Sequence, residues 1–586
     1  MYILGIGCYY HDSSAALLND GKIVAAAAEE RFTRMKHDTS FPINAINYCL
    51  KSQEITIDDV DYIGFYEKPF IKFERVLFQH IEMFPRSFKT FLSSTPSWLN
   101  EKLRTIGTIR KKLKYKGDVM FIEHHMAHAA SSFLASPFNK AAILTIDGVG
   151  EWTTTAYGIC KDNNINLIKE IKFPHSIGLL YSTITAYLGF SVNNSEYKVM
   201  GLSAYGIMDT KKNPYYKRLK KVIDIKDDGS YRLNMKYFIY HYANRMPSKK
   251  LCDLLGGPIR KKDGEITKRH KDIAAALQMI TEEVVVKILS YLHKVTKLDN
   301  IVIAGGVGLN SVNNGKILKN TPFKHIWIQP DAGDGGTSMG VALYIYYTIL
   351  GNKRDYVLKS AYLGPEFISK EIREFLDFHK IKYSEFKNDD ELVKRVAHLI
   401  YKNNIIGWFQ GKMEWGPRAL GSRSIIANPC NPEMKDILNL KVKHREYFRP
   451  FAPVVCRDDV EDYFDCDTPL PDSTDFMLMV YPIKKKWHDK IPSVTHVDGS
   501  GRLQTIRREQ NSLFYDLIRE FEKFSGIPIL INTSFNIRGE PIVCNPYDAY
   551  RCMMGTGIDY LVIDRFLIAR EDNPHHMWNS KQDIKD

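Results

Sequence analysis

The chain has 586 residues, of which 44% are hydrophobic and 25% charged, and its formal net charge is +13. This length is too great for one hydrophobic core, so at least two domains of an ordinary soluble globular protein are expected. The longest near-apolar run, residues 340–350, is too short to cross a bilayer, and residues 1–7 lack the basic segment of a secretory signal. The nine cysteines include no Cys-x-x-Cys pair. This predicts reduced thiols in a cytoplasm, and it excludes a disulfide framework and a thiolate zinc site.

Much of the positive charge lies in two segments, residues 104–116 and 211–221. We interpret these segments mainly as solvated basic helix faces. An enzyme that handles phosphorylated substrates also needs buried Arg and Lys side chains. RNA contact is the minor alternative, because the sequence has no signature of an RNA-binding module.

Two segments share one pattern of three short strands joined by tight polar turns. The predicted strands are 3–7, 13–18 and 23–28 in the first segment, and 143–146, 153–159 and 165–169 in the second. In both segments the first strand leads into a loop rich in Gly, Asp and hydroxyl groups, whose N–H groups can cradle phosphate oxygens. The pattern resembles the two half-domains of the actin, sugar-kinase and heat-shock ATPase superfold, which binds ATP between its halves. A chance likeness of two β-meanders is the alternative.

His124 and His128 lie four residues apart in a run that predicts a helix. Residues at this spacing share one helix face, so both imidazoles can bind one metal ion. Asp147 and Asp334 each follow an apolar strand-like run, and Asp334 lies on a glycine-rich bend that allows close approach to a metal or nucleotide. The alternative is a polar helix surface that binds nothing.

A buried strand at residues 300–304 runs into Gly305 and Gly306, and Asn310 follows. A strand, a glycine turn and a helix place unpaired N–H groups at a helix N-terminus, which suits a nucleotide phosphate or ribose. The sequence lacks GxxxxGK[ST] and GxGxxG, so it has neither a P-loop nor a dinucleotide-binding fingerprint.

Several motifs resemble one family closely. They cover residues 8–16, 29–38, 123–131, 196–206, 304–310, 411–424, 443–453, 494–498 and 532–536. The chain is similar, over residues 1–570, to the NodU/CmcH-type O-carbamoyltransferases, which modify nodulation factors, cephalosporins, aminoglycosides and related hydroxylated products. It departs from the pattern at Trp415, where Phe is expected, and at Arg538, and these changes do not alter the assignment.

The resemblance implies an α/β protein of two domains. Residues 1–350, with an insertion at 207–270, would form an actin/hexokinase-like (ASKHA) duplicated domain with the metal and nucleotide site, similar to that of the tRNA threonylcarbamoyl transferases. Residues 355–586 would form a YrdC-like α/β domain that makes carbamoyl adenylate.

The implied reaction is an ATP-dependent O-carbamoyl transfer. Carbamoyl phosphate and ATP, with Mg(II) expected, would give carbamoyl-AMP, and a hydroxyl of a small-molecule natural product or sugar would accept the carbamoyl group. By resemblance the metal, Fe(II) or another divalent ion, would be held by His124, His128, Asp147 and Asp334. Two imidazoles with carboxylate oxygens and open positions also suit ferrous iron on chemical grounds.

The dianion carbamoyl phosphate needs fixed cations near turns that allow close approach. The expected cations are Arg418, Arg423, Lys443, Arg445 and Arg449, with Arg418 and Lys443 counted as catalytic. Surface ion pairs are the alternative for any one of them. Asn532, Thr533 and Ser534 follow the apolar run 527–531. Their amide and hydroxyl groups suit a carbamoyl unit or phosphate, and a plain structural turn is the alternative.

Transfer to an alcohol needs a base, and a neutral imidazole is the expected one near pH 7. His11 is the candidate, with Asp12 orienting it; in the rival interpretation His11 donates a hydrogen bond to phosphate or substrate. Gly305, Gly306 and Asn310 are expected to bind the nucleotide, and Lys198 to face its phosphates.

The acceptor is not identified by the sequence. Aromatic side chains of the insertion could stack on a sugar, although packing is the default interpretation, and residues 67–116 are a second candidate for the acceptor wall or an interface. The expected partners are the acceptor, carbamoyl phosphate and ATP, without a membrane or nucleic acid, and a homodimer is left open. Two other functions are kept as alternatives: a tRNA threonylcarbamoyl-type transferase, and an ASKHA sugar kinase or ATPase.

Overall fold

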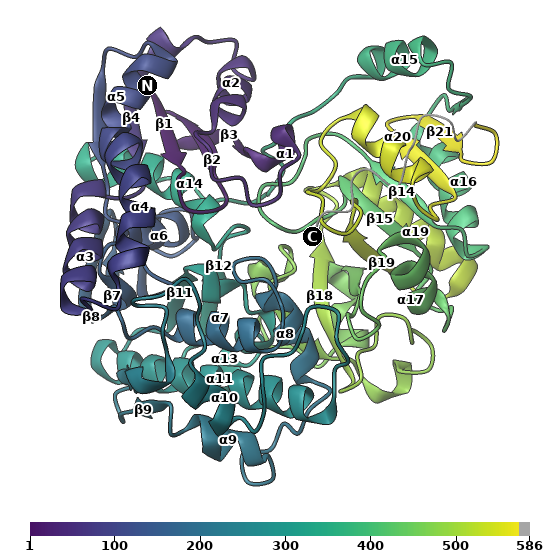
Figure 1. Cartoon of the computed structure of the whole chain (residues 1–586). Coiled ribbons are helices and arrows are strands. Elements are labelled where there is room, and N and C mark those ends of the chain that lie inside the picture. Colours follow the sequence, from purple (N-terminus) through teal and green to yellow (C-terminus); the bar gives the residue numbers. More distant parts are fainter. Residues whose placement is uncertain (574–586) are drawn as a thin grey trace. The chain divides into compact units, whose positions relative to one another are not determined.

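The computed structural model describes residues 1–573 and divides the chain into two compact units (Figure 1). Unit 1 comprises Met1–Ala25 and Thr39–Leu358, and unit 2 comprises Ala26–Asp38 and the chain from Lys359 onward. The sequence placed one division at residues 350–355 and did not separate the short segment Ala26–Asp38 from the N-terminal domain. None of the helices within residues 1–573 is long and apolar enough to cross a membrane.

Unit 1 contains two five-stranded sheets of the same topology. Their orders are β3-β2-β1-β4-β5 and β12-β11-β6-β7-β8. The strands are β1 (Tyr2–Gly7), β2 (Ser14–Asn19), β3 (Lys22–Ala28), β4 (Val60–Phe65), β5 (Asp118–Phe121), β6 (Lys140–Ile146), β7 (Thr153–Lys161), β8 (Asn164–Lys172), β11 (Asn300–Ala304) and β12 (His325–Ile328). In each sheet the first strand pairs antiparallel with the next strand and parallel with a later one. The repeat confirms the α/β class and the duplicated half-domains predicted from the sequence.

The burial of the strands follows their place in the sheets. Central β1 and β6 are buried along almost their whole length, whereas the edge strand β8 is mostly exposed or half-buried. Strands covered on both faces need continuous apolar runs, and an edge strand tolerates polar side chains. The hydrophobic pattern therefore selects which strands become central.

Two helices of unit 1 position the residues considered below. Helix α6 (His124–Phe133) packs on β6 and β11, helix α14 (Thr337–Leu343) packs on β1, β2 and β4, and the two helices pack against each other. A Cβ atom on Gly340 of α14 would lie 2.0 Å from the carbonyl oxygen of Ala127 in α6. The absence of a side chain at Gly340 therefore allows the two helices to approach closely.

The remaining elements of unit 1 are mainly helical. They include α2 (Ile43–Lys51), α3 (Pro69–Glu82), α4 (Phe88–Asn100), α5 (Thr105–Leu113), α7 (Ile177–Tyr187), α8 (Glu196–Ser203), α9 (Pro214–Leu219), α10 (Lys249–Leu254) and α11 (Lys268–Thr296). The predicted insertion 207–270 contains α9, α10 and a two-stranded sheet of β9 (Ile223–Ile225) and β10 (Tyr231–Leu233). The long α11 packs against α7, α8 and α9.

Unit 2 is built around a nine-stranded mixed sheet of order β13-β21-β20-β14-β15-β19-β16-β18-β17. Its strands are β13 (Ser384–Glu385), β14 (Ile406–Phe409), β15 (Arg423–Ala427), β16 (Ala452–Cys456), β17 (Met479–Pro482), β18 (Ser500–Ile506), β19 (Ile529–Ser534), β20 (Tyr560–Ile563) and β21 (Phe566–Ala569). Its longer helices are α15 (Ser369–Phe378), α16 (Asp389–Tyr401), α19 (Ser512–Ser525) and α20 (Pro546–Met554). A second, sheet-rich α/β domain therefore follows the duplicated one.

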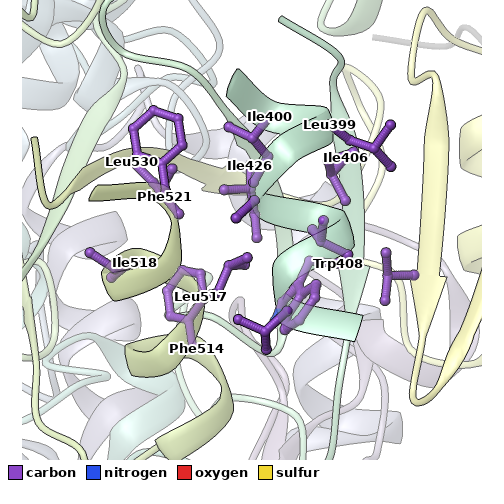
Figure 2. Close-up of a cluster of buried hydrophobic side chains, with 14 of the residues drawn as sticks. Leu399, Ile400, Ile406, Trp408, Ile426, Phe514, Leu517, Ile518, Phe521 and Leu530 are labelled. Carbon is purple, nitrogen blue, oxygen red and sulfur yellow. The ribbon is translucent and has the colours of Figure 1, made fainter. Parts of the chain in front are cut away.

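The core of unit 2 lies where α16 and α19 pack beside the sheet (Figure 2). Phe514, Leu517, Ile518 and Phe521 are fully buried and recur at helical spacing along α19, so they form one apolar face. The helix begins at the N-cap Asn511, whose side chain accepts the N–H of Phe514, and it ends at a left-handed Gly526. The apolar face anchors the helix beside strands that carry candidate functional residues.

Leu517→Ala is expected to lower the free energy of unfolding by about 2–5 kcal/mol, because it removes apolar surface and leaves a cavity in a packed core. Urea denaturation followed by circular dichroism measures this loss. Lys523→Ala, at an exposed position of the same helix, is the control and should change stability by about 0.5 kcal/mol or less. Equal effects of the two substitutions would contradict the placement of this core.

Candidate metal centre and anion site

Four buried side chains of unit 1 converge, and they come from three places in the chain. His124 and His128 lie on the first two turns of α6, Asp147 directly follows β6, and Asp334 begins a short 3₁₀ turn before α14. One potential ligand atom from each residue lies within 4.8 Å of the others. These are the four residues expected from the sequence to hold a metal.

The distances within this group are short. The Nε2 atoms of His124 and His128 are 3.1 Å apart. The Nε2 atom of His124 lies 3.3 Å from Oδ2 of Asp147, and the Nε2 atom of His128 lies 3.4 Å from Oδ1 of Asp334. Both imidazoles thus direct the same nitrogen toward the two carboxylates.

The chemistry of this donor set fits a divalent cation. Neither carboxylate oxygen of Asp334 has a hydrogen-bond partner among the described residues, although the side chain is buried. Burial raises the pKa of Asp147, but the hydrogen bond with His124 and the charge of His128 outweigh it and hold the pKa well below its usual range. Buried carboxylates that stay ionised are normally paired or bound to a metal. Nitrogen and oxygen donors of this kind suit a first-row transition metal.

Neighbouring groups fix the orientation of these side chains. The N–H of Gly306 donates to Oδ1 of Asp147 at 2.9 Å, and the carboxylate of Glu151 accepts the N–H of His124 at the start of α6. His125 lies away from the group, with its Nδ1 atom 2.8 Å from Oγ1 of Thr145. Burial and the charges of the two other histidines lower the pKa of His125 to about 3, so it remains neutral.

His11 borders the group and adjoins Asp12. Its Nε2 atom lies 3.7 Å from Oδ2 of Asp334, and its Nδ1 atom lies 2.9 Å from Oδ2 of Asp12. Burial lowers the pKa of His11, but the charges of Asp334 and Asp12 and the bond to Asp12 raise it to about 10. Because this pKa lies above 7, His11 is protonated at neutral pH while no cation neutralises these carboxylates. It is then a hydrogen-bond donor, as in the rival interpretation. A cation bound by Asp334 would reduce the main cause of this shift.

The expected nucleotide-binding residues of unit 1 have varied surroundings. Gly305 has φ +91°, and a Cβ atom there would lie 2.2 Å from the carbonyl oxygen of Ile146, so glycine is required on conformational grounds. The side chain of Asn310 caps a short helix and exchanges hydrogen bonds with Gln278. Lys198 is buried, and its Nζ atom lies 5.7 Å from the ring centroid of Phe190. These contacts favour structural roles for Gly305 and Asn310.

A group of arginines in unit 2 includes one residue that the sequence prediction missed. Arg502 on β18 is half-buried, and no hydrogen bond or ion pair joins its side chain to another residue within 1–573. Burial and the positive charges of Arg418 and Arg449 lower its pKa well below the usual range. Cations that repel one another in a partly buried place form a candidate anion site. The sequence feature that could have indicated Arg502 is its position as the one charged residue in the run 499–506.

The loop that carries Arg418 is organised by Glu414. One carboxylate oxygen of Glu414, Oε1, accepts the N–H groups of Leu420, Ser422 and Arg423 at 2.7–3.0 Å. Because one buried oxygen accepts the N–H groups of three residues of this loop, the loop has a fixed shape. This explains why the motif 411–424 needs an acidic residue among its cations.

Lys443 is buried in unit 2 and surrounded by oxygen acceptors. Its Nζ atom donates to the carbonyl oxygen of Ser534, and to the backbone oxygen and Oδ1 of Asn536 at 3.1 and 2.9 Å. Burial lowers the pKa of Lys443 well below 10.5, and the charges of Arg445 and Arg449 lower it further. The amino group of Lys443 therefore holds the end of β19 and the chain just after it, without a carboxylate partner among residues 1–573.

The pH dependence of stability should reveal this buried amine. Between its lowered pKa and 10.5, Lys443 binds fewer protons in the folded protein than in the unfolded chain, so its contribution to stability rises with pH across that window. The difference in unfolding free energy, wild type minus Lys443→Met, should therefore increase from neutral pH to pH 10.5 in urea titrations. Lys441→Met, at an exposed site, should show no such increase. A difference that stays flat for Lys443→Met would contradict the assignment.

The structure gives the contacts of three other sets of expected ligand-binding residues in unit 2. The guanidinium of Arg423 donates to the carbonyl oxygens of Gln410, Pro365 and Gly411 at 2.8–3.1 Å, which favours a structural role. Arg445 donates to Oδ1 of Asn439 at 2.7 Å.

Asn532, Thr533 and Ser534 lie inside β19, not in a turn after a strand. The sequence prediction ended the strand at residue 531, which was too early. The strand continues through these three polar residues, which pair with β15. The amide of Asn532 donates to Ala419 and Gln504, and its Oδ1 atom is buried without a partner. An unsatisfied buried acceptor of this kind suits an N–H donor of a ligand.

Comparisons with known proteins agree on one family. The profiles described as Carbamoyltransferase N-terminus and Carbamoyltransferase C-terminus match residues 2–343 and 397–570. The nodulation protein NolNO of Sinorhizobium fredii is 34% identical, over 97% of this chain and 81% of that protein. Nodulation protein U of Rhizobium tropici is 27% identical over 96% and 95%. An uncharacterized protein of Synechocystis sp. is 45% identical over 99% and 98%.

Proposed function

The chain belongs to the carbamoyltransferase family, and we propose that it is an ATP-dependent O-carbamoyltransferase acting on a hydroxyl of a small-molecule natural product or sugar. With Mg(II), carbamoyl phosphate would lose its phosphoryl group to water as inorganic phosphate. An oxygen of the resulting carbamate would then bond to the α-phosphorus of ATP, which breaks the bond to the β-phosphate and gives carbamoyl-AMP and pyrophosphate. The oxygen of the acceptor hydroxyl would then bond to the carbamoyl carbon, the bond from that carbon to AMP would break, and AMP would leave. The observation that carries the proposal is the convergence of His124, His128, Asp147 and Asp334 beside His11.

The cations of unit 2 support formation of the adenylate there. The positive charges of Arg418 and Arg449 act on Arg502, and no carboxylate within residues 1–573 forms an ion pair with Arg502. A carbamoyl phosphate dianion or a nucleotide phosphate would remove this repulsion and gain charge-assisted hydrogen bonds. The neighbouring polar groups of Asn532 and Lys443 would hold the uncharged part of the ligand.

The four converging residues of unit 1 support transfer there. His124, His128, Asp147 and Asp334 would hold a divalent metal, and their nitrogen and oxygen donors suit Fe(II). When bound, such an ion supplies a Lewis acid for a carbonyl or phosphoryl oxygen. The N–H of Gly306 and the carboxylate of Glu151 keep the ligands in place. The burial of the group excludes water that would compete with the acceptor.

His11 would handle the proton of the acceptor hydroxyl. Its Nε2 atom faces the converging residues while Asp12 contacts its Nδ1 atom, so the ring orientation is set. As a neutral imidazole it would accept the hydroxyl proton; as an imidazolium it would donate to the departing phosphate. The positive charge of the proposed metal decides between these roles, because it opposes the effect of Asp334 on the pKa of His11.

The test is a product analysis of the intact protein. AMP and pyrophosphate should appear from ATP only when carbamoyl phosphate is present, and a hydroxylated acceptor should gain one carbamoyl group by mass spectrometry. Release of ADP with an acceptor and without carbamoyl phosphate would instead indicate a sugar kinase. Tight binding of bulk tRNA at physiological salt would favour the threonylcarbamoyl-type alternative.

A further inference from the structure

Arg75 on α3 is a buried cation without an acidic partner. Its side chain is 6% exposed, and its Nε atom has no hydrogen-bond partner. Within residues 1–573, no carboxylate forms an ion pair with it and no acceptor forms a hydrogen bond with it. Buried charges in folded proteins are normally paired, because an isolated one loses its hydration without compensation. The guanidinium of Arg75 therefore has no directly paired anion within residues 1–573.

The acidic groups that act on Arg75 are engaged elsewhere. Glu67 pairs with Lys72, one turn earlier on the same helix. The Oε1 atom of Glu151 accepts the N–H groups of Lys68 and His124. Because both carboxylates are engaged elsewhere, a ligand could neutralise the charge of Arg75.

An aromatic ring holds the guanidinium of Arg75 in place. Its Cζ atom lies 4.9 Å from the ring centroid of Phe173, whose ring lies 6.2 Å from that of Tyr240 in the predicted insertion. Stacking on an aromatic ring fixes the plane of a guanidinium and leaves its N–H edge for a ligand. Because the guanidinium is already held in place, it loses less conformational entropy when an oxyanion binds.

Tyr10 interacts electrostatically both with Arg75 and with two of the four converging residues. Its ring centroid is 4.5 Å from that of His11, and Lys72 lies over the same ring at 5.1 Å. Burial and the charges of Asp147 and Asp334 raise the pKa of Tyr10, whereas Arg75 lowers it. Tyr10 is therefore close to His11 and within electrostatic range of Arg75, as is required if one molecule is to reach both.

We propose that Arg75 binds an oxyanion of the acceptor, so that the molecule carbamoylated by this enzyme carries a carboxylate, sulfate or phosphate besides its reactive hydroxyl. This inference rests on the proposed function, which places the acceptor beside His11. A guanidinium suits such a group because its N–H donors match two oxygens at once. The same chemistry could come from the phosphate of the nucleotide, and the experiment below separates the two sources.

The test compares matched pairs of hydroxyl compounds that differ in one anion. Glucose 6-phosphate is compared with glucose, and gluconate with sorbitol, by calorimetric titration of the intact protein at constant ionic strength. The anionic member of at least one pair should bind the wild type about 10- to 100-fold more tightly than its neutral partner, as expected for charge-assisted hydrogen bonds. Arg75→Gln should abolish this preference and Arg75→Lys should keep part of it. Arg86→Gln, at an exposed site just beyond α3, is the matched control and should keep all of it.

Three results would overturn the inference. One is equal binding of both members of every pair by the wild type; another is a preference that survives in Arg75→Gln. The third is a weaker affinity for AMP in Arg75→Gln than in the wild type, which would assign the guanidinium to the nucleotide. Thermal melting checks the variant: because an unpaired buried charge is removed, Arg75→Gln should melt no lower than the wild type, and a lower melting temperature would indicate a structural role. These measurements do not require transfer, so a failure of the proposed reaction would be seen separately, as missing AMP formation.

Discussion

His124→Ala is expected to reduce the bound metal to a trace and to lower carbamoyl transfer by about 10³-fold, while AMP formation that depends on carbamoyl phosphate continues. The physical reason is that His124 supplies one of four converging donors, and the loss of metal removes several kcal/mol of charge stabilisation from the transfer step. The adenylate-forming cations belong to unit 2, so they should be unaffected. Metal analysis of the purified protein and separate assays of AMP and of carbamoylated product measure the three quantities.

His293→Ala is the matched control for this experiment. His293 lies in the last turn of α11 and contacts the ring of Phe323, and it is not part of the converging group. Its substitution should leave metal content and transfer unchanged. If His124→Ala folds normally but loses AMP formation together with transfer, the separation of the two activities is wrong. If it keeps its full metal content, the proposed ligand set is wrong.

Arg502→Gln is expected to lower the formation of carbamoyl-AMP by about 10²-fold or more, with the metal content unchanged. The positive charges of Arg418 and Arg449 act on Arg502, whose side chain forms no ion pair within residues 1–573, and we propose that an anion from outside the chain binds there. Removing one charged hydrogen-bond donor to a phosphate costs about 1.5–3 kcal/mol, and more when the remaining cations stay uncompensated. Pyrophosphate release from ATP and carbamoyl phosphate measures the effect.

The stability of Arg502→Gln separates a binding role from a structural one. Because the substitution relieves repulsion, the melting temperature without ligand should stay the same or rise. Carbamoyl phosphate should raise the melting temperature of the wild type and should do so less for the variant. Arg508→Gln, which loses only an exposed ion pair with Asp516, is the control and should retain full activity. A marked loss of stability in Arg502→Gln with normal adenylate formation would refute the anion site.

Local patterns were sufficient for the elements that surround the candidate metal centre. The two sets of three strands appear at the predicted positions, and α6 begins at His124 as the small residues and the spacing indicated. These features depend on hydrophobic periodicity and on the helical repeat, which act between residues close in the sequence. His124 and His128 share a face for the same reason.

Long-range pairing decided which polar residues meet. Asp147 and Asp334 follow β6 and β12, two strands of one sheet that lie far apart in the sequence, and the packing of α6 on β6 and against α14 brings the two histidines to them. Arg502 comes near Arg418 because the loop that follows Arg418 reaches β18, where the amide of Gln504 donates to the carbonyl oxygen of Leu420 at 2.9 Å. The sequence shows each residue type but not these distances.

The amino-acid sequence by itself determined the family, the repeated strand pattern, and the helix that presents two imidazoles on one face, because short-range sterics and apolar spacing specify them. Only the tertiary structure decided that Asn532 lies inside a strand, that Arg423 is occupied by backbone carbonyls, and that Arg75 and Arg502 form no ion pair with a carboxylate of residues 1–573. The reason is that a buried charge has a meaning only relative to the groups around it, and those groups come from distant parts of the chain.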